Sequence, residues 1–273
     1  MGQYGAYSGA PGHSDTDRYP SAAIWSKLDA LAERPGRTFG YWDDMCGLVM
    51  MPTITTEIGV ATAPVPYKMF GSSGATITQE TDEIGGVWTL TEATDNESVS
   101  FATEQQPFRI STSVKKLIAF EARIKVSSIA DTGSNFIIGL GSDRTLVVGD
   151  PIATTGALIS TIDFVGFQRL EADGDQLEAT YQAGGVAAVV PVANAFTLVA
   201  DTFVKCGFLY DPDVDDTLRF FINGIELVTG VTVTAVGTAG PFDINLGFIC
   251  AHMAAATTPG TESIDWWKCY QAA

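Results

Sequence analysis

The chain has 273 residues, 46% of them hydrophobic, which is enough for the core of one large domain. Its formal net charge of −17 argues against a nucleic-acid partner, since phosphate contacts need clustered lysine and arginine. No run of apolar residues is long enough to predict a membrane-spanning helix, so no membrane partner is expected. The first 20 residues lack the basic and apolar regions of a signal peptide, and we expect synthesis in the cytoplasm.

The N-terminal part of the chain contains one predicted helix. Residues 1–20 are rich in Gly, Tyr, Ser and Pro without periodicity, and such a segment is not expected to fold alone. Residues 21–33 predict a helix with Ser21 as N-cap, and Arg34-Pro35-Gly36 ends it. Its apolar side chains share one face at helical spacing: Ile24, Trp25, Leu28, Leu31 and Ala32.

Residues 37–75 are apolar but aperiodic, which indicates an extended segment. We therefore predict an N-terminal arm over residues 1–75 and a separate folded domain over residues 76–273. Two interpretations of the arm remain open, since it can pack on its own domain or on a neighbouring subunit. The aromatic residues predicted to bind a partner through this arm are Tyr4, Tyr7, Tyr19, Trp25 and Trp42.

From residue 76 onward, short segments with strand-like alternation follow one another and are separated by Gly and Asp turns. No helical segment interrupts them, so the pattern predicts an all-β fold, a two-sheet antiparallel jelly-roll sandwich. The predicted strands cover residues 86–92, 97–103, 117–127, 135–142, 163–170, 176–182, 202–229, 242–250 and 262–271.

Two of these segments allow finer predictions. Residues 202–227 indicate three strands, and Asn223-Gly224 favours a type I′ hairpin between the last two, because both residues tolerate positive φ. In the last strand, alternation predicts that Ile264, Trp266 and Tyr270 share a face. Trp266 and Trp267 then point to opposite sides. The outer ring would serve a subunit contact or a glycan.

The four cysteines are widely spaced, at Cys46, Cys206, Cys250 and Cys269. This spacing favours reduced, buried thiols, although a Cys250–Cys269 bridge between terminal strands is an alternative. A zinc site needs cysteine or histidine pairs at short spacing, and the two histidines, His13 and His252, have no such neighbours.

The most acidic string resembles the E-x-D-x-E pattern of glycosidases only in part. Glu171, Asp173 and Asp175 are followed by Glu178, but Asp173-Gly174-Asp175 is typical of a turn. Carboxylates in a turn are solvated and do not hold the paired geometry that hydrolysis needs. Because nucleophile and phosphate-loop motifs are also missing, we predict that the protein is not an enzyme and needs no cofactor.

The densest acidic cluster contains Asp211, Asp213, Asp215 and Asp216. Alternating aspartates in a turn can supply three or four of the oxygens that Ca²⁺ requires. The D-x-D-x-D-G pattern is incomplete and Pro212 stiffens the turn. The cluster is therefore a weak calcium candidate, and a solvated hairpin is the alternative.

Several of the predicted strands together resemble a known family. FEARIKV, NFIIGLGS, VGFQR, TFVKCGFLYD, LRFFINGIEL and IDWWKCYQ are similar, in this order, to the concanavalin A/laminin G-like jelly-roll domain of structural proteins of tailed bacteriophages. The resemblance covers residues 115–271. It implies a non-enzymatic capsid decoration, or cement, protein on the outer surface of the virion, synthesised in the host cytoplasm. The implied partner is the major capsid protein, and the implied oligomer is a homotrimer. The alternative is a carbohydrate-binding, lectin-like adhesin.

Overall fold

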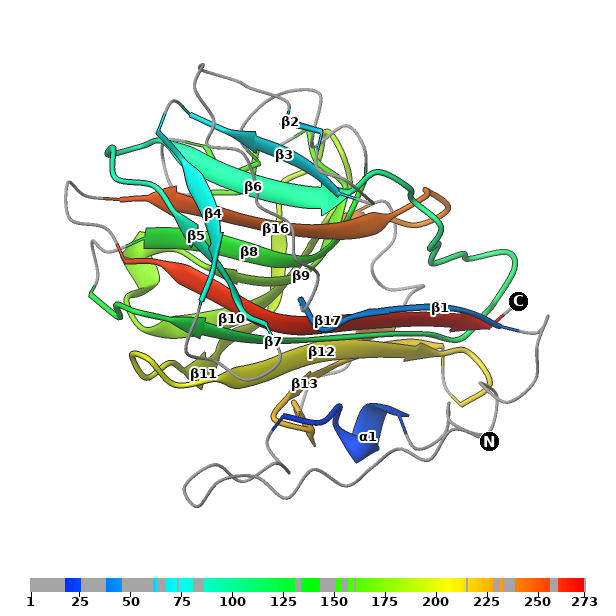
Figure 1. Cartoon of the computed structure of the whole chain (residues 1–273). Helices are drawn as coiled ribbons and strands as arrows, with labels where there is room; N and C mark the ends of the chain where they lie inside the picture. Colours follow the sequence, from blue (N-terminus) through cyan, green and yellow to red (C-terminus); the bar gives the residue numbers. More distant parts are fainter. Residues whose placement is uncertain are drawn as a thin grey trace, which may run out of the picture.

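Two antiparallel β-sheets packed face to face make up the described part of the computed structural model (Figure 1). No helix within this part is both long and apolar enough to cross a membrane. The described residues are 18–25, 38–45, 61–62, 67–72, 74–80, 86–130, 134–142, 151–153, 157–159, 161–214, 216–227, 231–232, 239–255 and 260–272.

Within these ranges sheet A has nine strands and sheet B has eight. Sheet A contains β1 (Thr38–Asp43), β4 (Thr76–Gln79), β5 (Trp88–Thr91), β7 (Ile118–Val126), β12 (Val204–Asp211), β13 (Thr217–Ile222), β14 (Ile225–Glu226), β15 (Val231–Thr232) and β17 (Glu262–Ala272). Sheet B contains β2 (Ala61–Thr62), β3 (Tyr67–Gly71), β6 (Ser98–Thr103), β8 (Ser134–Gly141), β9 (Phe164–Arg169), β10 (Gln176–Gln182), β11 (Val189–Thr197) and β16 (Gly247–Ala254). The predicted two-sheet antiparallel sandwich is confirmed.

The core lies between the two sheets and follows the alternation of their strands. On β7, β12 and β13 every second residue enters the core, and the rings of Phe120 and Phe208 stack at 5.3 Å between centroids. Trp267 of β17 stacks on Phe248 of sheet B at 4.4 Å. The hairpin prediction at Asn223-Gly224 is also confirmed, since both residues have positive φ.

The predicted boundary between arm and sandwich near residue 75 is wrong for two segments. β1 pairs with β17 along its length, from Thr38 opposite Ala272 to Asp43 opposite Trp267, and β3 pairs with β6. Both segments are therefore strands of the sandwich. Their pairing partners lie far along the chain, and neither segment shows the clear alternation that would have indicated a strand.

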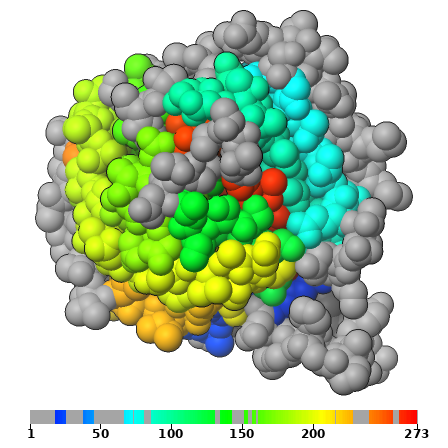
Figure 2. Space-filling model, turned by 90° about the vertical axis from the view of Figure 1, so that its left-hand side faces the viewer, coloured from blue at the N-terminus to red at the C-terminus, as the bar shows by residue number. Residues whose placement is uncertain are grey.

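Residues 18–25 cover the outer face of sheet A. The only described part of the predicted helix is α1 (Ala22–Trp25), because residues 26–33 lie outside the described residues. Ile24 and Trp25 pack on Leu209 of β12 and Phe221 of β13, and Figure 2 shows this segment in blue below β12 and β13. For these residues, packing on their own domain is the interpretation that the structure supports.

Polar contacts fix this covering segment in place. The backbone N–H of Ser21 and the indole N–H of Trp25 both donate to Glu121 Oε2, at 2.8 and 2.7 Å. At the other end, Arg18 pairs with the buried Asp265 at 2.6 Å. Burial raises the pKa of Glu121, although these hydrogen bonds act in the opposite direction. We call residues 18–25 with Glu121 and Asp265 the polar clamp.

The outer face of sheet B is covered differently, by aliphatic side chains. Ile152, Leu158 and Ile162, from the connection between β8 and β9, pack on a satellite apolar cluster. The sheet residues in that cluster are Phe70, Ala102, Ile137, Phe164, Ile249, Ala251 and Met253. We call these three aliphatic residues the apolar cover.

The last strand corrects the prediction for its tryptophans. A register shift between Ile264 and Trp266 indicates a bulge, which reverses the alternation beyond it. Ile264 and Trp267 therefore both enter the core, whereas Trp266 does not share the face of Ile264. Trp266 is nevertheless buried, and its indole N–H donates to the Arg18 carbonyl at 2.6 Å. Neither ring is available to a glycan or a subunit.

Cys206, Cys250 and Cys269 are free and buried, as predicted, and Cys46 lies outside the described residues. Cys250 and Cys269 belong to opposite sheets rather than to paired strands. Burial raises the pKa of each of the three thiols, which leaves them protonated and unreactive.

Candidate functional site

The predicted partner-binding aromatics have three different outcomes. Tyr4 and Tyr7 lie outside the described residues. Trp25 is 3% exposed and belongs to the polar clamp, so it is not an exposed contact residue. Tyr19 and Trp42 are 53% and 51% exposed, which leaves both rings accessible. The Lys268 amine lies 5.4 Å from the Trp42 ring centroid.

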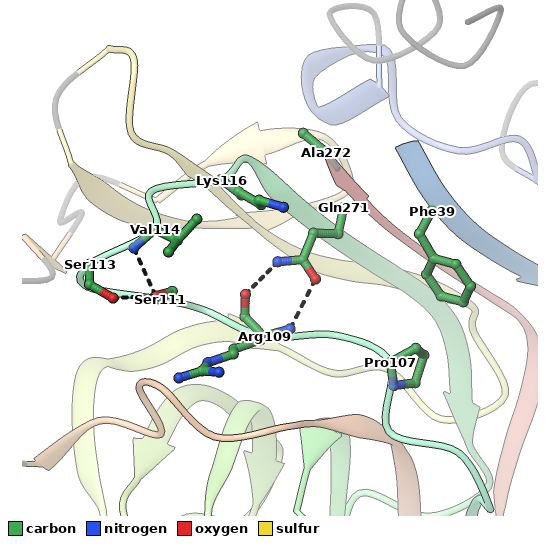
Figure 3. Close-up of a pocket in the computed structure, with 9 residues that line it drawn as sticks. All are labelled: Phe39, Pro107, Arg109, Ser111, Ser113, Val114, Lys116, Gln271 and Ala272. Carbon is green, nitrogen blue, oxygen red and sulfur yellow. Dashed lines mark hydrogen bonds between the residues drawn. The ribbon is translucent and has the colours of Figure 1, made fainter. Parts of the chain in front are cut away.

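A second exposed aromatic on β1, Phe39, borders a hollow that the sequence did not predict (Figure 3). The hollow has a volume of about 370 Å³ and lies at the end of the sandwich where β17 finishes. Figure 3 shows Phe39 and Pro107 on one side of it and Ser113 and Val114 on the other. Its lining residues are Phe39, Pro107, Arg109, Ser111, Ser113, Val114, Lys116, Gln271 and Ala272.

Hydrogen bonds hold the wall of this pocket in a defined conformation. The Gln271 side-chain amide bonds to the backbone of Arg109 twice, because its oxygen accepts from the N–H at 3.0 Å and its nitrogen donates to the carbonyl at 2.5 Å. The Val114 N–H donates to Ser111 Oγ at 3.0 Å. Phe39 packs on Phe108 with ring centroids 5.4 Å apart. These contacts join the connection between β6 and β7 to β1 and β17.

The basic residues of this connection differ in their partners. Lys115 points to Asp216 and pairs with it at 2.8 Å. Arg109 is 3.4 Å from Asp243. Lys116 lines the pocket and, within the described part of the chain, makes no ion pair. In Figure 3 its side chain extends from the connection toward Gln271.

The acidic string considered for glycoside hydrolysis forms a turn, as predicted. Glu171–Asp173 is a single 3-10 turn, and Gly174 after it has φ of 60°. Glu178 instead lies on β10, where it accepts a hydrogen bond from Gln168 Nε2 at 3.1 Å. Burial raises the pKa of Glu178, and the nearby charge of Asp173 acts in the same direction. This carboxyl group is therefore fixed in the sheet and is not part of the pocket.

The weak calcium candidate is not assembled as an open set of oxygens in the described residues. Asp216 accepts from the Tyr210 hydroxyl at 2.5 Å and from Lys115 at 2.8 Å, and these contacts lower its pKa. Asp211 is buried and accepts from the backbone N–H of Asp213 at 3.2 Å. Asp215 lies outside the described residues. No group of three or more His, Cys, Asp or Glu side chains that could hold a metal is found within the described ranges.

The core itself contains ionisable groups that the sequence did not indicate. Glu262 of β17 and His252 of β16 are fully buried. Burial raises the pKa of Glu262 well above its usual range and lowers that of His252 to about 4. Burial therefore favours the uncharged form of each side chain. Because both are fully buried, we assign them to the core.

Comparison with known proteins establishes the fold and leaves the family open. No family model matches the sequence, and no curated protein sequence is similar to it. A protein of unknown function from Shewanella oneidensis MR-1 matches with a TM-score of 0.56 and 16% identity, over 93% of this chain and 97% of that one. Peanut lectin matches with a TM-score of 0.56 and 14% identity, over 86% and 98%.

An endo-1,3-beta-glucanase from Streptomyces sioyaensis matches with a TM-score of 0.50 and 12% identity, over 87% of this chain and 98% of that one. The fold is that of the concanavalin A-like lectins and glucanases. At these identities the similarity carries the architecture alone, because this sandwich supports both binding and catalysis.

Proposed function

We propose that this protein binds carbohydrate without cleaving it, through the pocket that Phe39 borders. The observation that carries the proposal is the composition of the pocket. A half-exposed aromatic ring lies across a hollow of about 370 Å³ from hydroxyl and amine donors. A sugar ring offers an apolar C–H face and a rim of hydroxyl groups, so it matches such a combination of ring and donors.

The same composition supports binding rather than catalysis. Within the described part of the chain, none of the lining residues is an Asp, Glu or His. Hydrolysis of a glycosidic bond by the common mechanisms needs two carboxyl groups on opposite sides of that bond. The carboxyl groups of Asp216 and Asp243, which contact the connection between β6 and β7, are already bonded to its basic and hydroxyl groups.

The proposal is tested by screening the full-length protein on a glycan array and titrating the best-bound oligosaccharide by calorimetry. We expect Phe39→Ala to weaken binding about tenfold, the loss expected for one stacking ring. Trp42→Ala is the matched control, because Trp42 lies on the same strand and is equally exposed but does not line the pocket. Thermal melts of both variants show whether loss of the Phe39–Phe108 contact, rather than loss of a sugar contact, changes binding in Phe39→Ala. Equal binding by wild type and Phe39→Ala, or no glycan bound on the array, would contradict the proposal.

A second candidate function is the capsid decoration that the resemblance to tailed-bacteriophage structural proteins implies. It is supported by the exposed rings of Tyr19 and Trp42, since accessible aromatics are enriched at protein–protein contacts. In this case the partner is the major capsid protein and the protein attaches as a trimer. Binding to undecorated phage heads would then be reduced by Trp42→Ala and unchanged by Phe39→Ala. Heads that bind neither the wild type nor the variants would exclude this function.

A further inference from the structure

The pocket that Phe39 borders is a place where this acidic chain gathers positive charge. Arg109, Lys115 and Lys116 belong to its 15 basic residues, and all three lie on the connection between β6 and β7. On a molecule with a net charge of −17, most of the surface repels anions. A local group of cations beside a hollow changes which ligands can approach it.

The three cations are not equivalent, because two of them are already neutralised. Lys115 is paired with Asp216 at 2.8 Å. Arg109 is 3.4 Å from Asp243, which also accepts hydrogen bonds from Ser111 and Thr112 at 2.7 and 2.5 Å. The hydrogen bonds from Thr112 and Ser111 lower the pKa of Asp243, so it is ionised at neutral pH. Its negative charge is therefore available to Arg109.

Lys116 is the third of these cations, and its charge is not neutralised by a neighbouring described residue. Lys116 is partly buried and lines the pocket, and within the described residues its ammonium group makes no ion pair and donates no hydrogen bond. Among the described residues that line the pocket, no acidic side chain balances it. An ammonium group without a counter-charge binds an anion more strongly beside a hollow that limits access of water, because screening by water is weaker there.

We propose that the pocket selects a sugar residue that carries a negatively charged substituent, with the sugar ring against Phe39 and the charge at Lys116. This inference rests on the proposed carbohydrate binding and adds the class of ligand. Uronic acids and sulfated sugars share the required chemistry, which is an apolar ring face with an anionic group at its edge. The ammonium group and the anion form a charge-assisted hydrogen bond, which is stronger than a neutral one.

The test compares three tetrasaccharides by calorimetric titration of the full chain. The first is tetragalacturonate, the second is its fully methyl-esterified form, which keeps the same backbone without charge, and the third is a sulfated galactan tetrasaccharide. Lys116→Met removes the pocket charge while keeping a similar length of side chain. Lys115→Met is the matched control, because this adjacent lysine is paired with Asp216 and does not line the pocket.

We expect at least one charged probe to bind about tenfold more tightly than the methyl ester, the scale of one charge-assisted hydrogen bond. Lys116→Met should remove that difference, Lys115→Met should preserve it, and added salt should reduce it. The stronger of the two charged probes identifies the substituent as carboxylate or sulfate.

Equal binding of the ester and both charged probes would overturn this inference, and so would an equal effect of the two lysine variants. If that equal binding is still lost in Phe39→Ala, the proposed carbohydrate binding stands and only the charge selection fails. Absence of binding to all three probes overturns the inference as well, whereas the proposed function is decided separately by the glycan array.

Discussion

The two sheets of this sandwich each have an outer face that must be covered, and the two covers use different chemistry. On sheet A the polar clamp holds residues 18–25 by hydrogen bonds and an ion pair to the buried Glu121 and Asp265. On sheet B the apolar cover packs Ile152, Leu158 and Ile162 on aliphatic and aromatic neighbours. Burial of apolar surface has no direction, whereas a hydrogen bond requires one geometry.

The two covers differ in how specifically each one is positioned. The polar clamp fixes residues 18–25, which are remote in sequence from Glu121 and Asp265, at one position on sheet A, and the Tyr19 carbonyl of this segment accepts a hydrogen bond from Lys205. The apolar cover requires volume and hydrophobicity only, so it tolerates other aliphatic residues of similar size. We therefore expect the two covers to respond differently to substitution and to pH.

The largest effect is expected on sheet B, from Ile162→Ala. This change removes fully buried methyl and methylene groups and leaves a cavity, which costs about 2–4 kcal/mol of the free energy of unfolding. The loss should be the same at pH 5 and pH 8, because none of the groups in the apolar cover titrates. Urea unfolding at both pH values measures it, with the exposed Ile225→Ala as a control near zero. A loss that changes with pH would show that the cover depends on a charged group.

On sheet A, Glu121→Ala should cost about 2 kcal/mol, because two buried donors, the Ser21 N–H and the Trp25 indole N–H, lose their acceptor. The same urea unfolding, followed by tryptophan fluorescence, measures the loss. Glu104→Ala is the control, since Glu104 is exposed and its surface ion pair with Lys68, at 3.9 Å, contributes little to stability. Equal stability of wild type and Glu121→Ala would mean that packing of Ile24 and Trp25 alone holds the segment.

The smallest effect concerns the charge of Glu121. Its pKa is raised by burial, so the folded state holds its proton more tightly than the unfolded state does. The stabilisation is complete below the unfolded pKa and is lost as the pH rises through the folded pKa. Glu121→Gln keeps an acceptor oxygen for both donors and removes this titration. The variant should therefore gain stability relative to wild type as the pH rises from below the unfolded pKa through the folded pKa of Glu121.

Parallel pH profiles for wild type and Glu121→Gln would show instead that the carboxyl group is solvated in both states. With Ile162→Ala pH-independent and Glu121→Gln pH-dependent, the contrast between the two covers would be established by one set of unfolding curves.

The sequence by itself determined the parts of this protein that depend on neighbours along the chain. Alternation in β7, β12 and β13 predicted both the strands and the residues that enter the core, because side chains of a strand point to opposite faces in turn. Asn223-Gly224 predicted its turn through the conformations that these two residues tolerate. The wide spacing of the cysteines predicted free thiols at Cys206, Cys250 and Cys269.

Only the tertiary structure decided the remaining features, because they depend on contacts between distant segments. β1 became a strand by pairing with β17, and one bulge reversed the predicted faces of Trp266 and Trp267. Trp25 of α1 is buried on sheet A, where its indole N–H donates to Glu121 of β7. The pocket combines Phe39, the connection from Pro107 to Lys116 and Gln271, three regions without a common motif. A local sequence pattern predicts which face of a strand a side chain occupies. It does not predict which remote segment packs against that face.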